Sequence, residues 1–412
     1  MSRAYSIVHL DIARKYFSPE QLHAFIDCLS ENSIDQLELY FSDNQGFRLA
    51  VDDMVFNVNG VSYDLSKALG DGITDGTSGM TPDGSGKYLS AAEMTDIINY
   101  ASEKNVEIVP AFDMPGHMGA ILQYYPQFCY KAGDEQSVTS LDFISPEAID
   151  FSLAVFDRYV SFFATNGCRH FNAVCDEVAL EMGGIERIYN DGRLEQLINY
   201  ITKLVGIIKD HEMVPRIFND ALYYGNDPAY DTDSSAEVCY CIPSGGSASG
   251  IAKTHPMING STDLFWVMGV PDWQVDIQRI RSFKQELFSD GSTAKTAGNM
   301  LCFWCDKANA MTGEEFLSAA APLINAFGKK LEKYNQKMSV RHDGVCSSPY
   351  YKGCPCPREC PLHGRCCDCV HHHIDERIEA GEPAENTDWL VECMKLAHEG
   401  RFEEIYVHKN ES

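Results

Sequence analysis

Strand-like and helical stretches alternate along most of this 412-residue chain, and this alternation limits the possible folds more than any other feature. Eight short runs are rich in β-branched and aromatic residues, and helical stretches with apolar residues at a 3.6-residue period follow seven of them. The eight runs are residues 6–12, 35–42, 107–113, 170–177, 215–221, 236–242, 257–266 and 298–305. Eight strands that alternate with helices over about 330 residues are typical of a (β/α)8 barrel, so we predict an α/β fold of the TIM-barrel class.

Two local features refine this prediction. Ser18 and Ser90 precede helical stretches with acidic residues in the first turn, and we expect both to be helix N-caps. Residues 44–88 and 118–146 are rich in Gly, Ser, Asp and Tyr. We predict that they form long loops after the second and third strands.

Cysteine spacing changes near residue 340. Eight of the 16 cysteines are scattered over the first 340 residues at no ligand-like spacing, and isolated thiols of this kind are most simply core residues. The other eight follow residue 345. We therefore predict a barrel domain over residues 1–338 and a small Cys-rich module with a helical tail over residues 339–412.

The Cys-rich module has the residue types and spacing of a metal site. Thiolates this close together in a reducing compartment need a metal, most often tetrahedral Zn²⁺, and an iron–sulfur cluster is the alternative. We predict a structural zinc site here and no cofactor for catalysis. The predicted ligands are Cys354, Cys356, Cys360, His363, Cys366, Cys367 and Cys369.

The charge and hydropathy patterns restrict the partners. A net charge of -27 argues against nucleic acid and against an anionic membrane surface, because phosphate binding needs clustered positive charge. No apolar run approaches the ~18 residues that a membrane-spanning helix needs, and the N-terminus lacks the apolar core of a signal peptide. We expect a soluble, cytoplasmic protein that binds neutral or cationic ligands.

Carboxylates end seven of the eight predicted strands. In a (β/α)8 barrel the functional site is built at these C-terminal strand ends. Such a rim could bind metals or accept hydrogen bonds from the hydroxyls of a sugar. A two-metal site would supply more histidines than the single candidate His117, so carbohydrate is the better interpretation. The rim residues are Asp11 with Arg14, Asp43, Asp113 with His117, Asp176 with Glu177, Asp220, Cys241, Asp263 and Asp306.

Six motifs also carry a family resemblance over about residues 6–336. They are LDIARKYFS, LYFSDNQGF, YLSAAEMTDIINYASEKNVEIVPAFDMPGHMGAI, HFNAVCDEV, FNDALYY and LCFWCDKA. In order and spacing the chain resembles the family-20 glycoside hydrolases, which are β-N-acetylhexosaminidases, and among them the dispersin-like single-barrel branch. The resemblance implies a retaining exo-acting hydrolase of terminal β-linked N-acetylhexosamine.

The resemblance also implies catalytic roles. Glu177 corresponds to the general acid, and Asp176 to the residue that orients the substrate's acetamido group. That group supplies the nucleophile, so the mechanism is substrate-assisted. Adjacent carboxylates repel as anions, which we expect to raise the pKa of one and keep an acid protonated. Asp113 and His117 would form a supporting shell that holds Glu177.

Substrate-binding roles follow in the same way. Arg14 would bind two hydroxyls of the terminal sugar, Trp304 would form an apolar wall, and Asp306 would accept from the 4- or 6-hydroxyl. Asp43 could instead be a turn residue, and Asp220 a helix cap. The full predicted substrate-binding set is Arg14, Asp43, Phe218, Asp220, Cys241, Asp263, Trp304 and Asp306.

Some positions depart from the family pattern. Val174-Cys175 replaces the usual Gly-Gly before the acid pair, and Ala111 replaces a glutamate. Phe218 and Cys241 replace two of three tryptophans that box the sugar, and the tyrosine expected to bind the acetamido carbonyl aligns near Asp263 and Leu264. These changes suggest a modified hexosamine, such as one with a 6-phosphate or 6-sulfate.

Two other classes of function remain open from the sequence. The barrel could bind sugar without efficient turnover and act as a sensor or regulator through its metal module. Alternatively, the rim carboxylates could serve a metal-dependent hydrolase.

Overall fold

The computed structural model describes residues 4–74, 80–220, 222, 224, 232–243 and 245–340. The chain divides into two units, and the barrel lies in the unit Ser2–Lys333, whereas the other includes Tyr334–Ser412. The predicted metal ligands between Cys354 and Cys369 lie outside the described residues. The zinc site therefore stays a prediction.

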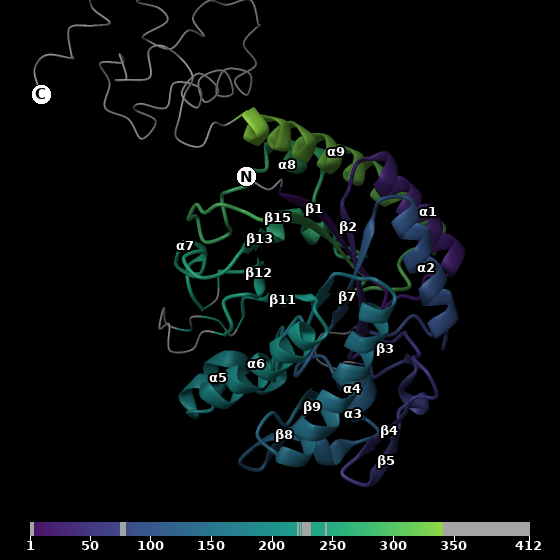
Figure 1. Ribbon diagram of the computed structural model, residues 1–412, viewed down its shortest axis with the longest axis vertical. Coiled ribbons are helices and arrows are strands. Elements are labelled where there is room, and N and C mark those ends of the chain that lie inside the picture. The colour runs from purple at the N-terminus through teal and green to yellow at the C-terminus, as the bar shows by residue number, and fades with distance from the viewer. Residues whose placement is uncertain are drawn as a thin grey trace, which may run out of the picture. The chain divides into compact units, whose positions relative to one another are not determined.

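The described residues form a closed barrel of parallel strands, which confirms the predicted fold class (Figure 1). The barrel closes at β1 (Tyr5–Asp11), which pairs in parallel with both β2 (Gln36–Asp43) and β15 (Gly298–Trp304). The strands between β2 and β15 are, in order, β7 (Glu107–Phe112), β10 (His170–Asn172), β11 (Val214–Phe218), β12 (Glu237–Tyr240) and β13 (Met257–Asn259).

Helices cover the outside of the barrel (Figure 1). Ser18 and Ser90 each form a capping box at the start of α1 and α2, as predicted. The long helices are α1 (Pro19–Glu31), α2 (Ala91–Glu103), α4 (Pro146–Thr165), α6 (Leu194–Asp210) and α9 (Gly313–Val340). The short ones are α3 (Gly119–Leu122), α5 (Gly184–Asn190), α7 (Ala248–Ile251) and α8 (Ile277–Ser282). The helical layer is therefore thin after β12 and β13, where only α7 and α8 are described.

The two predicted loops contain small hairpins. In the first, β4 (Val55–Val58) pairs with β5 (Val61–Asp64), and in the second, β8 (Cys129–Ala132) pairs with β9 (Glu135–Leu141). The prediction of loops was therefore right for the position of these segments and wrong for their lack of structure.

The prediction of one strand over residues 257–266 is wrong. β13 ends at Asn259, a 3-10 turn covers Thr262–Leu264, and β14 (Phe265–Val267) then pairs with β15. The hydroxyl of Ser261 accepts a hydrogen bond from the Asp263 amide at 3.2 Å, and such a local bond competes with strand pairing. Asp263 consequently lies in the turn rather than at a strand end.

Charged side chains fill part of the barrel interior below the strand ends. Arg216 Nη1 donates to Glu38 at 2.9 Å, and Arg216 Nη2 donates to Glu237 at 2.9 Å. His9 Nδ1 lies 2.9 Å from the other oxygen of Glu38, and its ring centroid lies 4.4 Å from that of Trp304. The buried ion-pair network thus packs, through His9, against the ring of Trp304.

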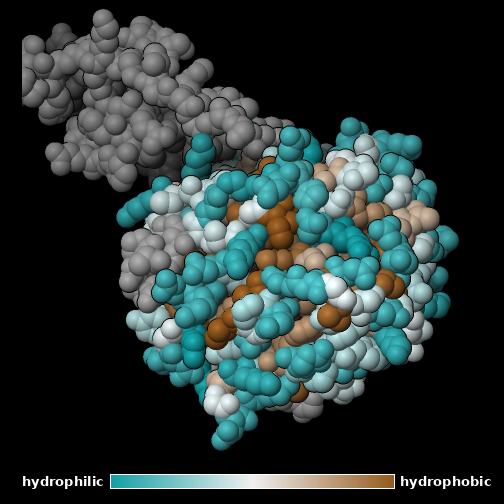
Figure 2. Space-filling view, turned by 60° about the horizontal axis from the view of Figure 1, so that its bottom comes forward, coloured by the Kyte–Doolittle hydropathy of each residue, from teal (hydrophilic) through white to brown (hydrophobic). Residues whose placement is uncertain are grey.

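Seven of the eight cysteines described in the barrel are buried, which confirms their predicted place in the core. Outside, hydrophilic residues surround a strip of hydrophobic ones on the face in Figure 2. None of the helices in the described part of the chain is both long and apolar enough to cross a membrane.

Candidate active site

A cavity of about 280 Å³ opens at the C-terminal ends of the barrel strands, where the sequence predicts the site. Most predicted site residues line it, and they come from segments that are far apart in the chain. These are Arg14, His117, Asp176, Glu177, Phe218, Asp220, Cys241, Trp304 and Asp306. Asp43, Asp113 and Asp263 do not line it.

Arg14 reaches the cavity from the segment that follows β1. Its Nη1 donates to Asp11 at 2.9 Å, its Nη2 lies 2.9 Å from Asp43, and its Nε donates to Gln45 at 3.2 Å. Asp11 also accepts from the backbone amide of Arg14 at 2.9 Å, so the strand end fixes both the backbone and the guanidinium. A guanidinium has five N–H donors, which leaves two for a ligand.

Asp43 lies behind the cavity and not in its wall, contrary to its predicted contact with substrate. Its Oδ2 accepts from Tyr40 at 2.8 Å and lies 2.9 Å from Arg14 and 3.1 Å from Nδ1 of His117. Burial raises the pKa of Asp43, but Arg14 and His117 outweigh burial and hold it well below its usual range. Asp43 is therefore a buried anion that positions two cavity residues.

His117 contacts Glu177 directly and has a second carboxylate partner. Its Nε2 lies 3.3 Å from Glu177, and its Nδ1 lies 3.1 Å from Asp43. Asp113 accepts from the Asp176 amide at 3.2 Å and lies 3.2 Å from the hydroxyl of Tyr40, whose single proton goes to Asp43. His117 lies in the loop after β7 and has a left-handed φ of 48°.

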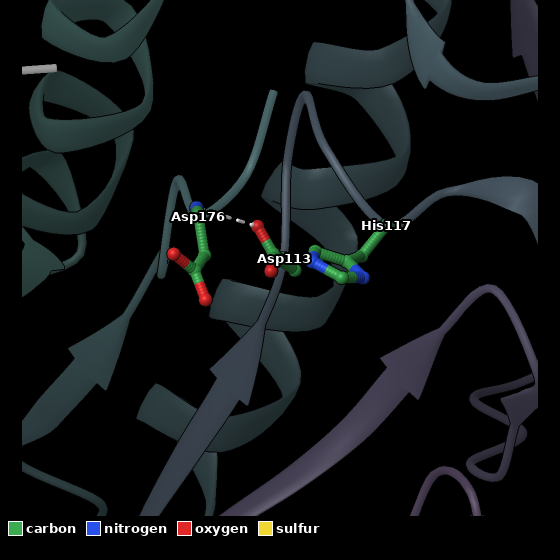
Figure 3. Close-up of side chains that lie close together, drawn as sticks. All are labelled: Asp113, His117 and Asp176. Atoms are coloured by element: carbon green, nitrogen blue, oxygen red, sulfur yellow. Dashed lines mark hydrogen bonds between the residues drawn. The ribbon is translucent and has the colours of Figure 1, made fainter. Parts of the chain in front are cut away.

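Figure 3 shows Asp113 between Asp176 and His117. One ligand-type atom of each of these three lies within 4.8 Å of the others, a spacing at which three side chains could hold a metal ion. Both nitrogens of His117 face carboxylates, so the ring donates from both and has no free lone pair for a metal. In this arrangement the three residues do not fit a metal site.

Asp176 is a partly buried carboxyl beside two others. Burial, followed by the charges of Asp220 and Glu177, raises the pKa of Asp176 well above its ordinary value. A hydrogen bond between the side chains of Asp176 and Asp220 raises the pKa of the former and lowers that of the latter, so Asp176 donates its proton. Asp176 is consequently the protonated member of the adjacent acid pair.

Glu177 differs from Asp176 in exposure and in charge. Its side chain is 45% exposed, and its backbone amide donates to Asp220 at 3.1 Å. The hydrogen bond from His117 lowers the pKa of Glu177, against the effect of burial. Burial, more than repulsion within the pair, raises the pKa of Asp176, and that residue rather than the predicted general acid Glu177 has the raised pKa.

The backbone before this pair is left-handed. Val174 and Cys175 have φ values of 59° and 66°, and Glu177 has 42°. A β-branched residue with positive φ is a rare and strained choice, and glycine adopts this region at no steric cost. This geometry is one that the Gly-Gly of the related pattern would adopt without strain, and Val174-Cys175 adopts it with side chains.

Aromatic and apolar side chains line the opposite part of the cavity. Trp304 is 9% exposed and packs on His9 and Tyr40, with ring centroids 4.4 and 5.4 Å apart. Phe218 and Cys241 also line this wall, and the amide of Cys241 donates to Asn219 at 2.9 Å. The cavity is therefore acidic on one side and apolar on the other.

Asp263 lies outside the cavity that most of the other predicted site residues line. Its side chain is 56% exposed, pairs with Arg279 and lines a separate groove. The turn at Thr262–Leu264 moves it away from the strand ends. Thr262 reaches the cavity in its place.

Other residues line the cavity that sequence reasoning missed. They are Tyr40, Met80, Ile242, Thr262, Phe265, Val267, Val270 and Trp273. Tyr40 lies two residues after Glu38 on β2, and side chains two residues apart on a strand share a face, here the inward one. The loop residues give no comparable signal, because the turn that brings them to the cavity depends on the pairing of β14.

The comparisons with known proteins agree with this geometry. A family model described as "Glycosyl hydrolase family 20, catalytic domain" matches residues 4–213. A beta-hexosaminidase of Akkermansia muciniphila is 24% identical over 261 residues, which cover 60% of this chain and 49% of that protein. An N,N'-diacetylchitobiase of Vibrio harveyi is 30% identical over 126 residues, which cover 28% of this chain and 14% of that protein. This chain thus matches about half of the first relative's length.

Solved structures show the same fold. A structure of the pneumococcal virulence factor StrH has a TM-score of 0.72 and 24% identity, and it covers 85% of this chain and 90% of its own. Dispersin B has a TM-score of 0.62 and 21% identity, and it covers 80% of this chain and 99% of its own.

Proposed function

This chain belongs to glycosyl hydrolase family 20, and from that premise we propose that it hydrolyses terminal β-linked N-acetylhexosamine with retention of configuration. One observation carries the proposal. Asp176 and Glu177 are adjacent in sequence, both line the cavity, and their pKa values shift in opposite directions. Two carboxyls whose environments differ in this way are suited to two different roles.

The first step breaks the glycosidic bond. The acetamido oxygen of the substrate attacks C1, the leaving oxygen takes a proton from Glu177, and an oxazolinium ring forms. Asp176 would accept a hydrogen bond from the acetamido N–H through its unprotonated oxygen, and Asp220, to which Asp176 donates its proton in a hydrogen bond, would supply the negative charge beside the positive ring. Water then attacks C1 with Glu177 as the base, and the two inversions give net retention.

Glu177 needs a proton before the first step, and His117 can supply it. In the free protein, burial lowers the pKa of His117, but Asp43, Glu177 and Asp113 raise it well above its ordinary value. A sugar that enters the cavity removes water from the half-exposed Glu177 and raises the pKa of its carboxyl. The proton then moves from His117 Nε2 to Glu177 Oε2 across 3.3 Å.

The terminal sugar would contact the groups around this pair. Arg14 would donate its two remaining N–H groups to neighbouring hydroxyls, and Asp306 would accept from the 4- or 6-hydroxyl. Trp304 would pack against the sugar ring. Burial raises the pKa of Asp306, and the charge of Arg14 lowers it. We expect the two side chains to contact the same edge of the sugar.

The charge of the cavity bears on a 6-substituent. Among the described lining residues the cations Arg14 and His117 are both already paired with carboxylates, and four acids line the same space. A 6-phosphate or 6-sulfate would meet this negative charge without a free cation. We therefore infer an uncharged terminal hexosamine.

Glu177→Gln tests the proposal. We expect kcat to fall by at least ~10²-fold with the fold unchanged, because a positioned general acid contributes on this scale. Glu186→Gln, an exposed site on α5, is the matched control and should keep full activity. Proton NMR of the first product should show the β-anomer. An α-product would contradict the mechanism, and sugar binding without hydrolysis would identify a binding protein instead.

A further inference from the structure

The strand β9 contacts both loops that carry the proposed proton pair. On the side of the loop after β7, the amide of Met118 donates to the carbonyl of Thr139 at 2.7 Å. The amide of Leu141 donates to the carbonyl of Pro115 at 2.8 Å. The bonded loop positions lie just before and just after His117, so β9 holds this loop on both sides of the imidazole.

The same strand holds the loop after β10. The hydroxyl of Ser140 accepts from the amide of Ala179 at 2.7 Å, and both residues are buried. Glu177 and Ala179 have left-handed backbone, with φ values of 42° and 52°. Residues other than glycine adopt this conformation at a cost in free energy, so a bond to a fixed neighbour is needed to keep the segment in place.

Glu181 adds a carboxylate to this contact. It lies in the 3-10 turn Leu180–Met182, and its side chain reaches back to β9. Its Oε1 accepts from the hydroxyl of Ser137 and from the amide of Val138 at 3.1 Å, and its Oε2 accepts from the hydroxyl of Thr139 at 2.7 Å. Hydrogen bonds to an ionised acceptor are stronger than neutral ones. Glu181 does not line the cavity, so it can affect catalysis only through what it holds.

The two loops also touch each other on the near side of Glu177. Asp113 accepts from the amide of Asp176 at 3.2 Å, the bond drawn in Figure 3. A Cβ added to Gly116 would lie 2.2 Å from the carbonyl oxygen of Asp176, so the two backbones are in direct contact. This contact fixes the residue before Glu177, and β9 fixes the residues after it. Glu177 thus lies between two fixed points.

We propose that β9 sets the distance between His117 and Glu177, and that Glu181 is a positioning residue that anchors the loop of Glu177 to this strand. The inference rests on the proposed function, in which a proton crosses the 3.3 Å between these two side chains. Proton transfer needs hydrogen-bond distance, and a displacement of about 1 Å can cost ~10²-fold in rate. Without the carboxylate of Glu181, the turn Leu180–Met182 loses its bonds to β9 and Glu177 moves away from His117.

The test compares two leaving groups in Glu181→Ala. The substrates are the methyl and the 4-nitrophenyl β-glycosides of N-acetylglucosamine. Methanol is a poor leaving group that needs the proton of Glu177, whereas 4-nitrophenolate leaves without one. We expect kcat/KM to fall at least ~10-fold for the methyl glycoside and less than about 3-fold for the 4-nitrophenyl glycoside.

Two variants serve as controls for this comparison. Glu181→Gln keeps a carbonyl oxygen that can accept from Ser137 and Val138, so it should keep most of the activity on both substrates. Glu186→Ala removes an exposed acid from α5, and it should leave both rates unchanged.

NMR titration of the His117 imidazole tests the same contact without a substrate. Burial lowers the pKa of His117, and Asp43 and Glu177 raise it. This pKa should therefore fall in Glu181→Ala and stay in Glu181→Gln. In the Glu177→Gln background, Glu181→Ala should have no further effect on it, because the group that Glu181 positions is already lost.

Three results would overturn the proposal. Equal losses for both leaving groups, or an unchanged pKa of His117, would show that Glu181 only stabilises the fold. Unchanged rates in Glu181→Ala would show that the pair is held without it. If the wild-type protein hydrolyses neither glycoside, the proposed function fails separately, and the NMR titration then decides the positioning role by itself.

Discussion

His117 bonds to Glu177 through Nε2 at 3.3 Å, so one dissociable proton is shared between an imidazole and the proposed general acid. His117 carries this proton in the free protein, because its pKa is raised and that of Glu177 is lowered. In the free protein the proton that catalysis needs is therefore on the imidazole of His117 rather than on the carboxyl of Glu177.

His117→Asn should therefore shift the pH dependence as well as the rate. In the wild type, activity is lost only when the pH rises through the raised pKa of His117. In the variant Glu177 alone must hold the proton, so the alkaline limb of the kcat profile moves to lower pH, and kcat near pH 7 falls by ~10²-fold. His211→Asn, which removes a histidine paired with Asp157 at the surface, is the control. An unshifted profile would contradict the shared proton.

Asp113→Asn should stabilise the protein, and more so at high pH. Burial raises the pKa of Asp113 to about 7 from an ordinary value of 3.8. The folded state therefore keeps a proton that the unfolded chain releases near pH 4, so stability is lost as the pH rises from 4 through 7. Asparagine mimics the neutral acid and avoids this loss.

Urea unfolding at pH 4.5 and pH 8 measures the effect. From pH 4.5 to pH 8 the free energy of unfolding of Asp113→Asn should rise relative to that of the wild type by on the order of 3 kcal/mol. Asp134→Asn, on the exposed β8–β9 turn, should show no such rise. A difference that does not change with pH would show that Asp113 is ionised throughout.

Glycine should be better than alanine at position 175. Cys175 has a φ of 66°, where alanine is strained and glycine is not, so Cys175→Gly should be more stable than Cys175→Ala by about 1 kcal/mol. At positions without a positive φ, alanine is usually more stable than glycine. Ala173 has no positive φ, so Ala173→Gly should destabilise the protein. Denaturant midpoints of the three variants give the comparison. If Cys175→Ala is instead more stable than Cys175→Gly, the backbone at this turn relaxes in the variants.

We propose that residues 346–369 bind one or two Zn²⁺ ions through thiolates. Elemental analysis of the full chain, purified without added metal, should find at least one equivalent. Cys354→Ser with Cys356→Ser should lose it, and Cys28→Ser in the barrel should not. A chelator should remove the metal and leave hydrolysis intact. Less than one equivalent of zinc or iron, with all thiols of this segment titratable, would refute the site.

Some of the site could be predicted because its residues sit at fixed points of the fold. Asp11, Asp43 and Trp304 end strands, so the order of strands alone places them at one rim. The partners of these residues were harder to predict. His117 pairs with Asp43 at the end of β2, and the spacing of four residues between Asp113 and His117 does not reveal this partner.

Other parts of the site depend on chain breaks that periodicity does not show. The prediction of one strand over residues 257–266 puts Asp263 near a strand end, yet a turn divides this segment after Asn259, at residue types that favour turns. Trp273 was missed for the opposite reason. A tryptophan is usually buried, and only the folded turn shows that this one is exposed.

The buried ion pairs inside the barrel restrict how the sequence can change. Arg216 is the shared cation of Glu38 and Glu237, so removing it alone would strand two carboxylates and cost about 3–5 kcal/mol. Replacing all three by apolar residues would in turn leave His9 and Asn172 without the Glu38 carboxylate. Homologues that diverge here should therefore change the whole network together, and libraries that randomise one position at a time should return the parent residue.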